Sequence, residues 1–316
     1  MIATVGETLV DLIEQQDGRF QACLGGSVCN FTLGVARQGI STTYLNPLSK
    51  DKFGEKFSAL LSGNGVVLRA NGGSASPTAL AVVSLDDQGS PTYAFHRQGV
   101  ADRDVNAEKL IASLPEALEL LHTGGLALVP DDLEKILTVI REAGRRKALV
   151  SIDANLRPIA VTACEAYVEG VKQAMAQAHI LKVSDEDLAV LGFGNATPAM
   201  LAAILFHEST LQLIAITHGA RGATLLTRAC QMTLPVPNDL KVVDTVGAGD
   251  CFHAGLVSYL TRAGRLASAA SLRQVDQDFL RCALQHAIAA ASINIMRSGC
   301  DPATWEETKQ SSQASA

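Results

Sequence analysis

The residues best suited to chemistry lie in one short segment, Asp244-Thr245-Val246-Gly247-Ala248-Gly249-Asp250-Cys251-Phe252. The sequence LKVV at 240–243 before it predicts a strand, and the mainly apolar sequence at 252–260 predicts a helix. The two glycines and the alanine let the backbone pass close to a ligand, at which the N–H groups of the helix's first turn then point. Together with the helix dipole, these N–H groups predict an anion site suited to phosphate.

Asp250 is out of place in a pure phosphate site, because its charge repels the anion. It fits a base that takes the proton of an acceptor hydroxyl while backbone amides hold the transferred group. The plainer alternative is an aspartate that caps a helix after a glycine turn. Two other phosphate-binding motifs fail. Phe252 stands where the dinucleotide-binding fingerprint needs a third glycine, and no Gly-Lys-Ser/Thr occurs.

The elements that must position this segment alternate, from residue 117 onward, between short apolar strands and amphipathic helices. Helices are expected at 131–146 and 164–177, and strands at 118–124, 148–155, 179–184 and 211–219. This alternation predicts an α/β fold with a central, mostly parallel sheet that helices flank on both faces.

The first hundred residues do not show this alternation of strands and helices. Strands are expected at 2–5 and 9–13, and residues 78–87 and 92–98 read as a hairpin joined by Gln88-Gly89-Ser90-Pro91. We therefore expect a small β-sheet lid beside the main sheet. The chain is predicted to be a single domain, 1–305, with lid strands at about 8–20 and 78–100 and a polar, frayed tail at 306–316.

Composition and charge narrow the class of protein. The 316 residues are 47% hydrophobic and 18% charged, which predicts a large core. A net charge of −6 and the lack of a basic face argue against nucleic acid as a partner. Seven scattered cysteines without a C-x-x-C pair, and no cleavable leader, predict reduced thiols in the cytoplasm. The longest apolar run, near 287–295, is too short to span a membrane.

The segment DTVGAGDCFHAG closely resembles the C-terminal signature of the ribokinase-like (PfkB-type) carbohydrate kinases. The stretch GGSVCN at 25–30 resembles the family's N-terminal signature, and Gly6-Glu7 with Asp11 resembles its opening G-E-x-x-x-D. Residues 51–54 match the D-x-F-G step, although Ser49 stands where a glycine is usual. The resemblance implies transfer of the γ-phosphoryl group of ATP to a sugar, with Asp250 as the base. It also implies Mg²⁺ as a cofactor and K⁺ as a further candidate ion.

The resemblance also implies which residues hold the sugar and the transferred phosphoryl group. Sugar hydroxyls would be bound from the main sheet by Asp11, Gly25, Gly26 and Asn30. Arg97 and Asp102 resemble the fructokinase R-x-x-x-A-D element, in which the arginine reaches the sugar from the lid. Asn155 and Arg157, in the D-x-N-x-R element after the expected strand 148–155, would lie near the phosphoryl group, although a plain polar turn explains them equally well.

A further set of residues is implied for the nucleotide and its ions. The nucleotide contacts would be Lys182, Ser184, Asp187, Thr217, Gly219, Gly222 and, near the adenine, Asn294. Asp187 would hold the metal through water, and Asp244 a monovalent cation. Ser184 and Asp187 also have the spacing of a helix-capping box, which is an equal alternative.

The choice of sugar depends on which members of the family the shorter sequence stretches resemble. The stretches GETLVDLI, DANLRP and KVSDEDL, with the R-x-x-x-A-D element, resemble bacterial fructokinases more than ribokinases, which favours D-fructose and its 6-hydroxyl. A 2-keto-3-deoxygluconate kinase and a ribokinase-type activity stay as alternatives. A catalytically silent sensor is disfavoured because Asp250, Gly247 and Gly249 are all present. The partners would then be a small sugar and ATP, without nucleic acid or membrane, and a homodimer could form through the lid sheet.

Overall fold

The computed structural model describes residues 1–316 except 16, 71, 86–90, 208 and 315–316. The main sheet is built from Ile2–Thr4 (β1), Thr42–Tyr44 (β4), Val67–Leu68 (β5), Leu120–Gly124 (β8), Leu149–Asp153 (β9), Ile180–Ser184 (β10), Leu213–Thr217 (β11), Ala223–Leu226 (β12) and Gln231–Leu234 (β13). Within the described residues these nine strands lie in the order β13-β12-β11-β10-β9-β8-β1-β4-β5. Neighbours from β5 to β11 are parallel, and β12 and β13 form an antiparallel edge.

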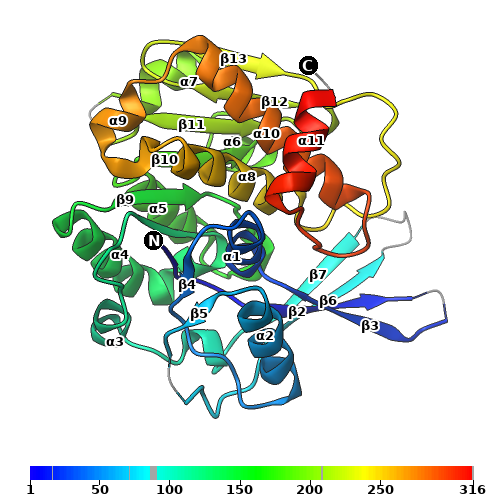
Figure 1. The fold of residues 1–316 in the computed structure, drawn as a ribbon. Coiled ribbons are helices and arrows are strands. Elements are labelled where there is room, and N and C mark those ends of the chain that lie inside the picture. The colour runs from blue at the N-terminus through cyan, green and yellow to red at the C-terminus, as the bar shows by residue number, and fades with distance from the viewer. Residues whose placement is uncertain (16, 71, 86–90, 208, 315–316) are drawn as a thin grey trace.

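Helices cover both faces of this sheet (Figure 1). One face packs against α3 (Ala107–Ala112), α4 (Pro130–Arg145), α5 (Cys164–Met175), α6 (Asp185–Val190) and α7 (Pro198–Leu205). The other packs against α1 (Ser27–Arg37), α8 (Ala248–Arg262), α9 (Ala269–Arg273) and α10 (Gln277–Ile295), while α2 (Lys52–Gly63) packs beside α1. The expected α/β class is confirmed.

The strand sequences explain the two layers. Alternate side chains of a strand point to opposite faces of its sheet. In β10, Leu181 and Val183 enter the core beneath α4 and α5, whereas Ile180 enters the core beneath α8 and α10.

In the described part of the chain, no helix is both long and apolar enough to cross a membrane.

A second sheet stands beside the main one as a lid (Figure 1). It consists of β2 (Leu9–Glu14), β3 (Phe20–Gly25), β6 (Ala79–Leu85) and β7 (Pro91–His96), in the order β3-β2-β6-β7. The antiparallel pairing of β6 with β7 was expected, and their turn at 86–90 lies outside the described residues. The strand β3 extends the lid beyond the expected range of 8–20, because Phe20–Gly25 pairs antiparallel with the whole length of β2.

The end of the chain differs from the expected frayed tail. Trp305–Ala314 form a helix, α11, which lies against α10 (Figure 1). The Arg262 guanidinium lies 4.3 Å from the centroid of the Trp305 ring, and Thr308 is fully buried. A cation–π contact and the buried Thr308 therefore hold a helix whose composition is otherwise polar.

Candidate active site

Helix α8 begins directly after Gly247, and this junction places its first-turn N–H groups at a cavity. Gly247 has a φ of 73°, in the left-handed region that glycine adopts without strain. A Cβ there would also collide with the Cys300 sulfur, so two separate constraints require glycine. The N–H of Ala248 donates to the Thr245 carbonyl at 3.2 Å. The next N–H groups of the turn have no intrahelical partner, as in any α-helix, and suit an anion.

The Asp250 carboxylate lies in this first turn and accepts two hydrogen bonds from α1. Ser27 Oγ donates to Asp250 Oδ1 at 2.7 Å, and Asn30 Nδ2 donates to Oδ2 at 2.9 Å. Asp250 is 8% exposed and lines the cavity, so it is oriented and largely desolvated yet reachable from one side. Gly247 is the N-cap of α8, so Asp250 is not the capping residue. This geometry suits a base for a hydroxyl that enters from the cavity.

Two cavities meet at this turn. The smaller cavity, of about 330 Å³, lies beneath the lid side chains Val83, Tyr93 and Phe95 and is lined on the main domain by Asp11, Gly26, Asn30 and Asp250. The larger cavity, of about 680 Å³, is lined by Ser184, Asp187, Thr217, Gly219 and Gly222. Both are lined by Asn155, Arg157, Lys182, Thr245, Ala248 and Gly249. A donor in the larger cavity and an acceptor in the smaller one would therefore meet beside Asp250.

The larger cavity also explains a wrong prediction. Residues 240–243 form no strand, and Val242 and Val243 are 56% and 55% exposed. Leu240 and Val242 line the larger cavity instead. The segment is apolar because it forms a cavity wall, and a short apolar run does not distinguish that environment from a buried strand.

On the sugar side, Asp11 extends from β2 into the smaller cavity. Burial raises the pKa of Asp11 to about 6, although the Arg157 charge opposes the rise. A Cβ on Gly25 would lie 2.7 Å from Asp11 Oδ2, so glycine leaves room for the carboxylate without lining the cavity itself. The structure thus brings Asp11, Gly26 and Asn30 together as expected.

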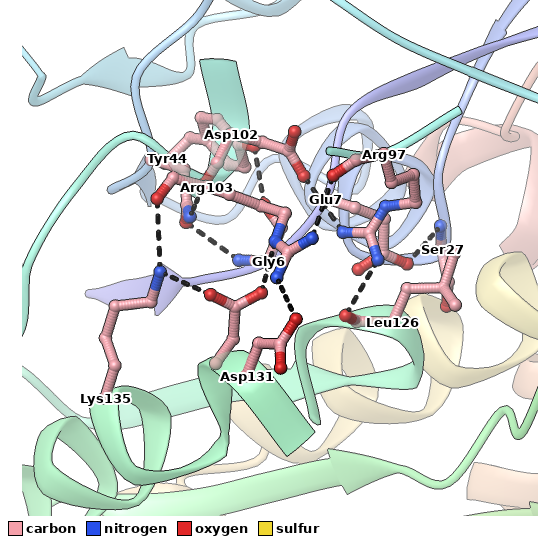
Figure 2. Close-up of polar contacts among 12 residues, drawn as sticks. Gly6, Glu7, Ser27, Tyr44, Arg97, Asp102, Arg103, Leu126, Asp131 and Lys135 are labelled. Carbon is pink, nitrogen blue, oxygen red and sulfur yellow. Dashed lines mark hydrogen bonds and ion pairs between the residues drawn. The ribbon is translucent and has the colours of Figure 1, made fainter. Parts of the chain in front are cut away.

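Arg97 and Asp102 do not line the smaller cavity, contrary to the expected lid-side contact with the sugar. Figure 2 shows the two side chains directed towards each other instead. Arg97 is 9% exposed, pairs with Asp102 at 3.2 Å and donates to the Leu126 carbonyl at 3.1 Å. A short 3-10 turn at Ala101–Arg103 carries Asp102 back towards the arginine. Asp102 supplies the carboxylate partner that a buried guanidinium needs, although Arg97 Nε and Asp102 Oδ1 have no hydrogen-bond partner among the described residues.

Glu7 is a cavity residue that the sequence suggested only as part of a motif. It lines the smaller cavity, and its Oε1 accepts the Ser27 N–H at 3.2 Å (Figure 2). Burial raises the pKa of Glu7 to about 7, against the nearby charge of Arg97. Glu7 therefore supports the start of α1, from which Ser27 and Asn30 hold Asp250.

On the nucleotide side, the capping alternative for Ser184 and Asp187 is confirmed. Ser184 Oγ accepts the Asp187 N–H at 3.1 Å, and Asp187 Oδ2 accepts the Ser184 N–H at 2.8 Å. The other oxygen, Oδ1, accepts the Leu156 N–H at 2.7 Å. Both residues still line the larger cavity, so a water-mediated metal contact through Asp187 stays a prediction.

Asn294 and Asp244 hold the loop before α8 rather than face the larger cavity. Asn294, expected near the adenine, is fully buried; its Nδ2 donates to the Val246 carbonyl at 2.8 Å. Asp244 accepts the N–H groups of Val246 and Gly299 at 2.9 and 2.8 Å. The structure therefore gives Asn294 a role in holding the loop and does not place it at the wall of the larger cavity. Its contact with the nucleotide and a cation at Asp244 stay predictions.

Comparison with known proteins identifies the class. The pfkB family carbohydrate kinase profile matches residues 1–307, so the chain belongs to this family. It is 30% identical to a fructokinase of Rhizobium leguminosarum bv. trifolii, over 89% of this chain and 86% of that protein.

Two solved structures share the fold. The fructokinase with bound ATP from Xylella fastidiosa superposes with a TM-score of 0.82 at 24% identity, covering 99% of this chain and 98% of that one. The fructokinase from Vibrio cholerae O395 in its fructose, ADP and calcium ion bound form has a TM-score of 0.77 at 24% identity, covering 95% and 94%. The ribokinase-like fold and the expected family are confirmed, and the chain is a phosphotransferase with an alcohol group as acceptor.

Proposed function

We propose that this carbohydrate kinase transfers the γ-phosphoryl group of ATP to the 6-hydroxyl of D-fructose. The observation that carries the proposal is the position of Asp250, held by Ser27 and Asn30 where the two cavities meet. The smaller cavity would hold the sugar under the lid, and the larger would hold ATP. The likeness to proteins named fructokinases supports fructose as the acceptor.

Asp250 acts on the hydroxyl, and the first turn of α8 acts on the phosphoryl group. The carboxylate accepts the hydroxyl proton as the sugar oxygen attacks phosphorus, and the N–H groups stabilise the charge on the transferred group. The lid side chains Val83, Tyr93 and Phe95 exclude water that would compete as an acceptor.

Magnesium would neutralise charge on the ATP phosphates. Among the described residues, no group of three or more His, Cys, Asp or Glu side chains could hold a metal ion. Mg²⁺ prefers oxygen ligands and keeps several waters, so we infer that the phosphates supply most of its ligands. Asp187, through water, is the protein group proposed for it, and K⁺ is proposed beside Asp244.

The buried Arg97–Asp102 pair favours a neutral sugar. A sugar acid such as 2-keto-3-deoxygluconate would need a cation for its carboxylate, and on the lid side Asp102 already neutralises Arg97. The cations that do line the smaller cavity, Arg157 and Lys182, also line the larger one, where they would face the phosphates. We expect kcat/KM for D-fructose to exceed that for ribose and for 2-keto-3-deoxygluconate in a coupled ADP-release assay. A sugar acid preferred tenfold over fructose, about 1.4 kcal/mol in transition-state binding, would contradict the fructose assignment but not the kinase class.

Asp11 predicts a pH dependence of sugar binding. Its pKa is raised to about 6, so lowering the pH from about 7 to about 5 protonates the carboxylate and removes an acceptor for sugar hydroxyls. We expect KM for the sugar to rise over this range in the parent. Asp11→Asn should have a higher KM at about pH 7 and a smaller pH dependence than the parent; Glu7, whose pKa is about 7, titrates in the same cavity and accounts for what remains. Asp17→Asn, on the exposed end of the lid, should behave like the parent. An equal pH dependence in Asp11→Asn and the parent would exclude this role.

Assembly and location are also proposals. Phe20 lies on the lid strand β3 and is 48% exposed, which supports a homodimer through the lid sheet. The cysteine pattern of the sequence supports a cytoplasmic location. Fructose or another small sugar, with ATP, would be the partners.

A further inference from the structure

Lys182 is a charged residue in the middle of a buried parallel strand. It lies in β10, where it pairs in register with Asp153 of β9, and it is 5% exposed. Its Nζ contacts Asp153 Oδ1 at 3.1 Å. A buried ion pair is seldom more stabilising than well-packed apolar residues, because both charges lose their hydration. Core stability therefore does not explain why lysine and aspartate occupy these two strand positions.

The position of the ammonium group suggests another reason. Lys182 lines both cavities, at their junction. A Cβ built on Gly249 would lie 3.0 Å from Lys182 Nζ, so the ammonium lies against the first turn of α8, one residue before Asp250. The neighbouring strand residues Ile180 and Leu181 are fully buried, which fixes the backbone from which the side chain extends.

The charges around Lys182 keep it protonated. Burial alone would lower its pKa, but the carboxylates of Asp153, Asp187 and Asp250 together raise it. Burial raises the pKa of Asp153 to about 7, and the Lys182 charge opposes that rise. Among the described residues, the Lys182 ammonium hydrogen-bonds only to Asp153, which leaves donors for further negative oxygens, and a phosphoryl group between the cavities would supply those oxygens.

We propose that Lys182 is a catalytic residue whose ammonium group binds the phosphoryl group during transfer, and that Asp153 is the positioning residue that aims it. This rests on the proposed kinase function. The sugar oxygen forms a bond to the γ-phosphorus while the bond from that phosphorus to the β–γ bridging oxygen breaks. The electron pair of the broken bond leaves with ADP, and the hydroxyl proton goes to Asp250. Lys182 donates hydrogen bonds and transfers no proton.

The test compares Lys182→Met with Lys182→Arg and with the control Lys172→Met, an exposed lysine on α5. The assay uses whichever sugar the parent phosphorylates fastest, so a wrong sugar assignment changes the acceptor and not the result for Lys182. We expect Lys182→Met to lower kcat by about 10- to 100-fold, the loss expected for a charge-assisted hydrogen bond. Lys182→Arg should keep more activity than Lys182→Met, and Lys172→Met should match the parent.

Binding separates catalysis from simple nucleotide affinity. Calorimetry with Mg²⁺ and the sugar would measure Kd for ADP alone and for ADP with aluminium fluoride, which mimics the phosphoryl group in transfer. We expect Lys182→Met to weaken the aluminium fluoride complex at least about tenfold and the ADP complex less than about threefold. Equal weakening of both would overturn the proposal, because Lys182 would then bind only the ground state.

A double variant separates catalysis from a structural ion pair. Lys182→Met/Asp153→Asn removes both charges, so a purely structural role predicts recovery of kcat, whereas the proposal predicts a kcat as low as that of Lys182→Met. Recovery to within about fivefold of the parent would overturn it. If thermal unfolding shows that Lys182→Met is not folded, the single variant Asp153→Asn tests the proposal in its place. This variant keeps the Lys182 ammonium but removes the carboxylate that orients it. We therefore expect a lower kcat and weaker binding of ADP with aluminium fluoride, at unchanged affinity for ADP alone. A kcat and an aluminium fluoride Kd equal to those of the parent would reject the proposal.

Discussion

Asp250→Asn should lower turnover by roughly 10²–10⁴-fold while sugar and nucleotide still bind. The change removes the proton acceptor and keeps the shape of the side chain. The amide oxygen can still accept from Ser27 Oγ, which donates to Asp250 Oδ1 at 2.7 Å. The new NH2 group replaces the acceptor of Asn30 Nδ2, so the Asn30 amide must turn over and accept with its oxygen, and the packing between α1 and α8 should then survive. Steady-state kinetics would measure kcat, and calorimetry would measure Kd for the sugar and for ADP.

A matched control is available on another helix. Asp278 is an exposed acidic residue in the first turn of α10, so Asp278→Asn tests the general cost of losing such a charge at a helix N-terminus. We expect Asp278→Asn to keep the parent's kcat. A kcat for Asp250→Asn within about tenfold of the parent would show that another group takes the proton.

The parts of this enzyme that could be predicted from sequence are those set by local patterns. The strands β8 to β11 and the helices α4 and α5 follow from apolar periodicity, and the turn before α8 follows from Gly247 and Gly249. The same reasoning failed for Trp305–Ala314, because a contact with Arg262, far back in the chain, stabilises that helix. It failed for residues 240–243 because a cavity wall can be as apolar as a strand.

The candidate site divides in the same way. Motif residues such as Asp11, Asn30 and Asp250 were predicted and meet in one cavity, since Asn30 and Asp250 lie in the first turns of α1 and α8 and Asp11 lies on β2 beside them. Ser27 was missed as a partner of Asp250 because the two are 223 positions apart and nothing local marks the contact. Arg97 was misplaced for the opposite reason. Its motif was clear, but the motif does not show that the Arg97 guanidinium forms a buried ion pair with Asp102.

Gly249→Val should lower kcat/KM for ATP by roughly 10²–10³-fold, comparable to the loss of a donor from an oxyanion hole. A Cβ at this position would lie 3.0 Å from Lys182 Nζ and 3.6 Å from its Cε, and a branched side chain adds two methyl groups there. These methyl groups would displace the ammonium and cover the N–H groups at which the phosphates are expected.

The matched control is Gly144→Val, near the end of the exposed side of α4, where an added Cβ meets nothing within 4 Å. Both variants replace a helical glycine by valine and carry a similar change in helix propensity, so thermal unfolding should separate that general effect from the local one. We expect Gly144→Val to keep the parent's kinetics. An ATP affinity and a kcat for Gly249→Val equal to those of Gly144→Val would place the phosphate site away from α8, and would then also remove the geometric argument for Lys182, because both depend on the same turn.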